Sequence, residues 1–161
     1  MSSPTREKSM FRRVLISSIS IVALGLSTSA FAQQYAPGTA AEAKAMLERA
    51  VAAVKADKAK ALDMFTKGEA GFKDRDLYPF CFSVADGKVL AGPPFVLGKD
   101  IRTFKDSTGK EFGKENFKAA VEGKISEVSY LFPRTDTGAP VPKMSFITGV
   151  SDLGCGVGYY P

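Results

Sequence analysis

The residue types that most often carry out catalysis are missing or isolated in this 161-residue sequence. It contains no histidine, so neither a Ser-His-Asp triad nor a Cys-His pair can be built, and the commonest general base and metal ligand is absent. The carboxylates fall in expected turns and on helix faces, without the spacing of a metal site. An enzyme would need a clustered carboxylate pair that the sequence does not show. We therefore expect no catalytic residue, no metal and no cofactor.

Three glycines near the C-terminus, Gly154, Gly156 and Gly158, alternate with other residues. A phosphate-binding loop would be followed by a helix, and none is expected here. We interpret these glycines as strand residues where another backbone comes close.

The N-terminus has the three parts of a secretory signal peptide. Four basic residues precede an uncharged apolar run (14–26), and Ala30 and Ala32 have the spacing that signal peptidase accepts. A membrane-spanning helix needs about 20 apolar residues, so an uncleaved anchor is the weaker alternative. We expect residues 1–32 to be cleaved, leaving one domain (33–161) in the periplasm, with no membrane insertion after cleavage.

The charge balance does not predict nucleic-acid binding. The net charge is +5, but three of these charges belong to the expected signal peptide, which leaves the rest near +2. Basic and acidic residues are also interspersed over residues 67–76, as on a solvated surface. We expect no nucleic-acid partner.

Hydrophobic periodicity predicts one long amphipathic helix over residues 39–67, kinked near Asp57. Thr39 is a plausible N-cap, and Gly68 follows the last turn. Further on, alternating residues predict strands and one short helix. The strands are expected over 77–85, 88–90, 125–132, 143–150 and 155–160, and the short helix over 114–121. This order predicts an α+β domain of two layers, with the helices on one side of an antiparallel sheet.

Several short motifs follow one another between Ala41 and Pro161. They are Ala61–Phe65, Gly71–Phe72, Asp76–Phe82, Asp86–Ala91, Leu97–Asp100, Asp106–Lys110, Pro142–Phe146 and Gly156–Pro161. In this order they resemble a single Cache domain of the soluble, type 2 kind. Such domains are PAS-like sensors outside the cytoplasm, usually on chemoreceptors and histidine kinases. This sequence departs from that family in lacking His and Trp, and in having Ala91–Gly92 where Ala-His is common.

The resemblance implies a PAS-like α+β fold, in which a long N-terminal amphipathic helix packs on a central antiparallel sheet of about five strands. In that plan the first and last strands are neighbours, so that Cys81 and Cys155 would face each other. Two cysteines in an oxidising compartment are candidates for a disulfide. Two buried thiols are the alternative.

The resemblance also implies a small-molecule pocket between the sheet and the loops in the middle of the sequence, mostly apolar with a few hydroxyls. Lys143 lies in a Pro-Lys motif that the family shares, where its ammonium could receive a carboxylate. Arg102 and Asp106 are further candidates from the loop, and Arg102 could pair with a carboxylate in bidentate fashion. The other expected lining residues are Tyr78, Phe80, Phe82, Phe95, Tyr130, Phe132, Ser145 and Tyr159. Core packing of the aromatic residues and a surface position for Lys143 and Arg102 are the alternatives.

Family members usually continue into a transmembrane helix and a signalling output, and neither follows Pro161 here. The resemblance thus implies a periplasmic sensor-type protein that binds a small organic acid and acts through a membrane-bound receptor or kinase. The alternative is a non-catalytic structural or protein-interaction module without a small ligand, which a collapsed pocket and a solvent-exposed Lys143 would favour.

Overall fold

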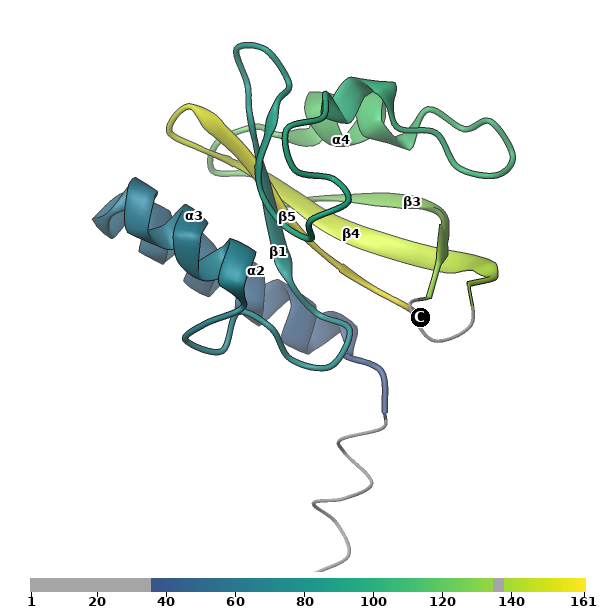
Figure 1. Ribbon diagram of the computed structural model, residues 1–161, viewed down its shortest axis with the longest axis horizontal. Coiled ribbons are helices and arrows are strands. Elements are labelled where there is room, and N and C mark those ends of the chain that lie inside the picture. The colour runs from purple at the N-terminus through teal and green to yellow at the C-terminus, as the bar shows by residue number, and fades with distance from the viewer. Residues whose placement is uncertain (1–35, 135–137) are drawn as a thin grey trace, which may run out of the picture.

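An antiparallel sheet lies between two layers of helices and loops (Figure 1). The computed structural model describes residues 36–134 and 138–161, so the predicted signal peptide lies outside the described residues. The strand order across the sheet is β2-β1-β5-β4-β3. The elements are α2 (Ala40–Ala56), α3 (Lys58–Lys67), β1 (Pro79–Ser83), β2 (Val89–Ala91), η1 (Ile101–Thr103), α4 (Phe112–Ala119), β3 (Ser126–Pro133), β4 (Pro140–Val150) and β5 (Leu153–Tyr159).

Local capping residues set the limits of α2 and α3. Thr39 and Glu42 form a capping box at the start of α2. Asp57 has an extended backbone that ends α2, and its carboxylate accepts the Lys60 N–H to begin α3. Gly68 ends α3 in the left-handed region at φ 72°. The predicted kink is therefore a break between two helices, and no helix of the described residues has the length and apolar character needed to cross a membrane.

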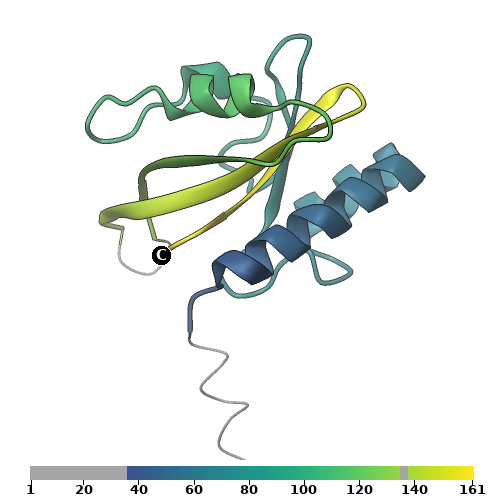
Figure 2. The ribbon, with the colours of Figure 1, turned by 180° about the vertical axis from the view of Figure 1, so that it is seen from behind.

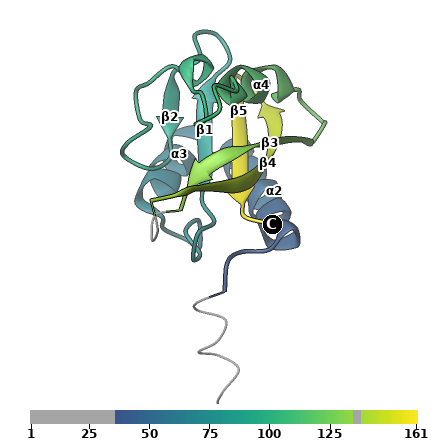
Figure 3. The ribbon, with the colours of Figure 1, turned by 90° about the vertical axis from the view of Figure 1, so that its right-hand side faces the viewer.

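Alternation along the strands produces one apolar layer on each face of the sheet. Cys155 and Val157 of β5 pack toward α2, whereas Phe80 and Phe82 of β1 pack with Phe112 of α4. The two faces are separately covered when the molecule is seen from behind and from the side (Figures 2 and 3). The expectation of two layers with all helices on one side is therefore wrong, because α4 and η1 cover the second apolar face. The prediction of a long N-terminal helical segment on a five-stranded antiparallel sheet is confirmed.

The first and last strands lie side by side, as the PAS-like plan implied. Cys81 on β1 is directly opposite Cys155 on β5, and the two form a disulfide with a Cα–Cα distance of 4.1 Å. Both residues are fully buried on the α2 side of the sheet. The predicted disulfide is confirmed, and it joins the two strands at the middle of the sheet.

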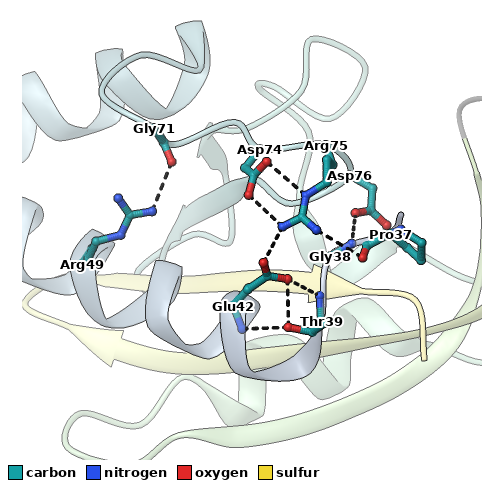
Figure 4. Close-up of polar contacts among 9 residues, drawn as sticks. All are labelled: Pro37, Gly38, Thr39, Glu42, Arg49, Gly71, Asp74, Arg75 and Asp76. Atoms are coloured by element: carbon teal, nitrogen blue, oxygen red, sulfur yellow. Dashed lines mark hydrogen bonds and ion pairs between the residues drawn. The ribbon is translucent and has the colours of Figure 1, made fainter. Parts of the chain in front are cut away.

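A polar cluster ties the start of α2 to the segment that leads into β1 (Figure 4). The Arg75 guanidinium lies between two carboxylates, 2.7 Å from Glu42 and 2.8 Å from Asp74. The Gly38 N–H donates to the Asp76 carboxylate at 2.6 Å. These contacts hold the chain in place just before β1, which is where the candidate site begins.

The disulfide generates a prediction about stability. Replacing both Cys81 and Cys155 with Ala should lower the free energy of unfolding by about 4 kcal/mol, because the bond restrains a long loop in the unfolded chain. The loop is long because the cysteines are 74 residues apart in sequence. Urea unfolding with and without dithiothreitol measures the effect. The double variant should be insensitive to the reductant, and wild-type stability unchanged by reduction would contradict the prediction.

Candidate ligand-binding site

The face of β5 that looks toward α4 carries no side chains. Gly154, Gly156 and Gly158 occupy it in alternation with residues that point toward α2. A Cβ atom at Gly158 would lie 2.6 Å from Cε of Lys143, and one at Gly156 would lie 2.7 Å from the ring of Phe80. Side chains from β4 and β1 therefore lie across the central strand. We expected another backbone near these glycines, but the nearest atoms at each of them belong to side chains.

A small cavity lies between this bare strand face and the segment 93–116. Its volume is about 40 Å³, which is room for about three water-sized groups. Six of the predicted residues line it: Tyr78, Phe80, Phe95, Tyr130, Phe132 and Lys143. The remaining lining residues are Val89, Pro93, Val96, Ile101, Phe104, Phe112, Asn116 and Gly158. The wall is thus mostly aromatic and aliphatic, with very few polar groups.

Three aromatic rings surround the ammonium group of Lys143. Its Nζ lies 5.0 Å from the ring centroid of Tyr78, 4.9 Å from that of Phe132 and 4.6 Å from that of Tyr160. Nζ also donates to the Tyr78 hydroxyl at 3.3 Å. The negative ring faces attract the cation. Lys143 is only 4% exposed, so the alternative of a surface lysine is excluded.

The charge on Lys143 has no close counter-ion. Among the described residues, no carboxylate lies within 4.0 Å of Nζ. Burial lowers the pKa of Lys143 to about 8, while the more distant negative charge of Asp76 opposes that shift. The ring faces also favour the charged form. The ammonium is therefore largely protonated at neutral pH and would gain from an anion beside it.

A larger cleft of about 750 Å³ adjoins the cavity. Tyr78, Phe132 and Lys143 belong to the walls of both, so the cleft leads to the ammonium. Its lining includes five basic residues and one acidic residue, although Lys67 and Arg75 are already paired with carboxylates. An excess of one charge sign in a cleft raises the local concentration of the opposite ion. The charged lining residues are Lys67, Lys73, Arg75, Arg134 and Lys143, with Asp76 the acidic one.

The fold is similar to that of solved sensor domains. The sequence matches no protein-family profile and no curated protein. It is similar in structure to a methyl-accepting chemotaxis protein from Vibrio parahaemolyticus RIMD 2210633, at 20% identity and a TM-score of 0.58, over 74% of this chain and 86% of that one. A periplasmic sensor domain of a chemotaxis protein is 23% identical, with a TM-score of 0.55 over 73% and 86% of the two chains. A Cache chemosensory domain described for carboxylic acid recognition is 20% identical, with a TM-score of 0.53 over 72% and 84%.

The fold is that of a single Cache domain. The resemblance to a Cache domain that the short motifs indicated is therefore confirmed at the level of the fold. In this Cache fold the cavity lies between the sheet and the middle segment, where the resemblance had placed a pocket.

Sequence reasoning missed Asn116, which belongs to the wall of the cavity. Its side chain is only 1% exposed, and neither its Nδ2 nor its Oδ1 has a hydrogen-bond partner in the part of the chain that the structure describes. Leaving such a buried polar group unpaired costs about 1–3 kcal/mol. A signal was present, because Asn116 is four residues after Phe112 and so lies on the same face of α4. An amide at a position where the helix should present an apolar side chain marks an unusual site.

Three predicted residues do not line the cavity: Phe82 and Ser145 are buried, and Tyr159 is partly buried. Phe82 is fully buried in the apolar layer beside it. Ser145 lies beneath it, with Oγ 2.7 Å from the Tyr130 hydroxyl, so this hydroxyl already has a partner in the core. Tyr159 is on the opposite face, where its ring stacks on Phe146 at a centroid distance of 5.5 Å.

Arg102 and Asp106 also lie away from the cavity. Arg102 on η1 pairs with Asp100 at 2.7 Å and is partly exposed. Asp106 organises its own loop, because its carboxylate accepts hydrogen bonds from Thr108 and from the Leu131 N–H of β3. The Thr108 hydroxyl and these backbone donors lower the pKa of Asp106 to about 2. The structure thus gives both residues a role in holding the middle segment.

The low pKa of Lys143 predicts a rise in stability with pH. The folded state releases this proton near pH 8, whereas the unfolded state holds it to about 10.5. Between these values the unfolded state binds more protons, so the free energy of unfolding should increase by up to ~1.4 kcal/mol per pH unit. Urea unfolding of wild type and Lys143→Met at pH 7, 8, 9 and 10 measures the difference. A difference that does not change with pH would contradict the assigned environment of Lys143.

The approach of Lys143 to Gly158 predicts a variant that moves the ammonium without unfolding the domain. In Gly158→Ala the new Cβ would lie 2.6 Å from Cε of Lys143 and 2.9 Å from Oγ of Ser145. The long lysine side chain can move further than the serine, so it should shift toward the cleft and regain a pKa nearer 10.5. NMR titration of the lysine Cε and Hε signals measures this pKa. Gly154→Ala is the matched control, because its Cβ would meet the Phe82 ring and should lower stability while leaving Lys143 unchanged. An unaltered Lys143 pKa in Gly158→Ala would contradict the prediction.

Proposed function

We propose that this Cache domain binds a small organic carboxylate, with the carboxylate beside the Lys143 ammonium. The observation that carries the proposal is a buried ammonium enclosed by three rings and without a close counter-ion among the described residues. A ligand carboxylate supplies the missing charge and accepts a charge-assisted hydrogen bond. One structural neighbour is itself described for carboxylic acid recognition, which supports this chemistry.

The route to the ammonium suits an anion. The basic cleft attracts negative ions, and Tyr78 and Phe132 continue from the cleft into the cavity. Apolar walls then exclude water from the ion pair and so strengthen it. The carboxylate would occupy the cleft side of Lys143, and the rest of a short ligand would extend into the cavity.

The proposal includes a place of action and a mode of action. The protein is exported to the periplasm, the signal peptide (1–32) is removed, and a single domain (33–161) reports ligand binding to a membrane-bound receptor or kinase. The basic and apolar N-terminal pattern supports export, as does a disulfide, which is stable in an oxidising compartment. The likeness in fold to sensor domains of chemotaxis proteins supports a sensory role.

A second candidate function is a structural or protein-interaction module without a small ligand. The observation that favours it is the size of the cavity, because about 40 Å³ leaves little room between the packed rings. In that case the Cache fold would serve contacts with another protein only.

Ligand binding is tested by thermal shift and calorimetry with a panel of short carboxylates, including acetate, propionate and lactate. An acid at 100 times its dissociation constant should stabilise the domain by about 2.7 kcal/mol. Lys143→Met should weaken binding by roughly 10- to 150-fold, which corresponds to the loss of ~1.5–3 kcal/mol for a hydrogen bond to a charged group.

The matched control is Lys124→Met, which removes an exposed lysine from the turn before β3. It should leave the affinity unchanged. Wild-type affinity should also fall above pH 8, because binding requires the protonated lysine. An unchanged affinity in Lys143→Met would remove this residue from the site, and no shift with any acid of the panel would favour the interaction module.

A further inference from the structure

The amide of Asn116 is the most unusual polar group in the described part of the chain. It is the only buried side chain there whose nitrogen and oxygen both lack a hydrogen-bond partner, and it belongs to the wall of the cavity that also contains Lys143. Because α4 presents an otherwise apolar face here, packing alone does not explain an amide at this position. A group that enters the cavity from outside can supply its partner.

The other polar groups of the cavity already have partners. The Tyr130 hydroxyl is paired with Ser145 at 2.7 Å, and the Tyr78 hydroxyl accepts from Lys143 at 3.3 Å. Burial raises the pKa of both tyrosines, so neither hydroxyl ionises at neutral pH. The Tyr78 hydroxyl can still donate its own proton, but it lies beside the Lys143 ammonium and so belongs to the same polar point. The second polar point of the cavity is the amide of Asn116.

We propose that the cavity selects a short hydroxycarboxylate, with its carboxylate at Lys143 and its hydroxyl at Asn116. A hydroxyl can meet either atom of the amide, because it accepts from Nδ2 and donates to Oδ1. A ketone oxygen can meet only Nδ2, and a methyl group can meet neither. A site with a buried hydrogen-bonding group rejects the ligand analogue that leaves this group unpaired. Asn116 is thus a specificity-determining residue of the carboxylate site.

The dimensions of the cavity limit the ligand. A volume of about 40 Å³ accepts about three water-sized groups beyond the cleft, so the acid has a chain of two or three carbons. Both polar points belong to the same small cavity, which suits a hydroxyl on the carbon next to the carboxylate. This inference rests on the proposed binding of a carboxylate at Lys143 and adds the second point of recognition.

Lactate and propionate are the decisive probes, because they differ only by the hydroxyl on that carbon. Calorimetry on wild type should show that the better-bound lactate enantiomer binds at least tenfold more tightly than propionate. Asn116→Leu replaces the amide with an apolar side chain of similar shape. It should reduce lactate affinity at least tenfold and leave propionate affinity equal or improved, whereas Lys143→Met should weaken both acids.

The outcomes separate the two proposals. Equal affinity for lactate and propionate in wild type would overturn the role of Asn116 while leaving the carboxylate site intact. The hydrogen-bond partner of the Asn116 amide would then be an ordered water molecule. A lactate preference that persists in Asn116→Leu would also overturn the role of Asn116. Binding of acetate but of neither lactate nor propionate would overturn only the hydroxycarboxylate proposal, whereas binding of no acid in the panel would overturn both proposals. If Asn116→Leu does not fold, Asn116→Ala with the same two acids replaces it.

Discussion

The bare face of β5 is the constraint on which the site depends. Because the central strand has no side chains toward α4, residues of β1 and β4 can lie across it instead of standing beside one another. Lys143 reaches its ring of aromatic side chains by passing over Gly158. The other face of the same strand carries Cys155 and Val157, which complete the core under α2. One strand thus provides dense packing on one side and the floor of a cavity on the other.

Two polar groups inside an apolar layer act against stability in the free domain. Within the described residues, Lys143 is a buried cation that only ring faces and a neutral hydroxyl surround closely, and the Asn116 amide has no hydrogen-bond partner. Such groups are uncommon in a packed core, because burial penalises them unless they are paired. Both belong to one cavity, and departures from good packing are typical of functional sites. Their coincidence is a stronger indication of binding than either residue alone.

Local signals in the sequence predicted the helices and most strands well. The caps at Thr39, Asp57 and Gly68 depend on neighbouring residues only, and the structure has all three. The disulfide needed the PAS-like plan, because strand neighbours that are far apart in sequence are not encoded locally. The position of α4 on the second face of the sheet was missed for the same reason.

The candidate site was predictable where strand alternation applied. Six of the predicted residues line the cavity, and strict alternation would also have placed Tyr159 on the face of Cys155, away from it. Arg102 lies in the single turn of η1 and Asp106 in the loop after it, and both segments are too short for a periodic pattern to indicate a direction. The burial of Lys143 depends on Gly158 of another strand and on ring contacts from three segments, which one position in the sequence cannot report.

The disulfide also makes the floor of the cavity stiffer than its cover. The floor is a hydrogen-bonded ladder in which β1 and β5 are covalently joined at Cys81 and Cys155, so these strands can neither slide nor spread. The cover, residues 93–116, is joined to Val89 of β2 by backbone hydrogen bonds with Lys99 and Gly98. Elsewhere it rests on the sheet through side-chain packing and the Asp106 loop. Any expansion needed to admit a molecule is taken up by the cover. The floor of the cavity is therefore the stiffer part and the cover the more compliant part, and a bound molecule would displace the cover relative to the sheet.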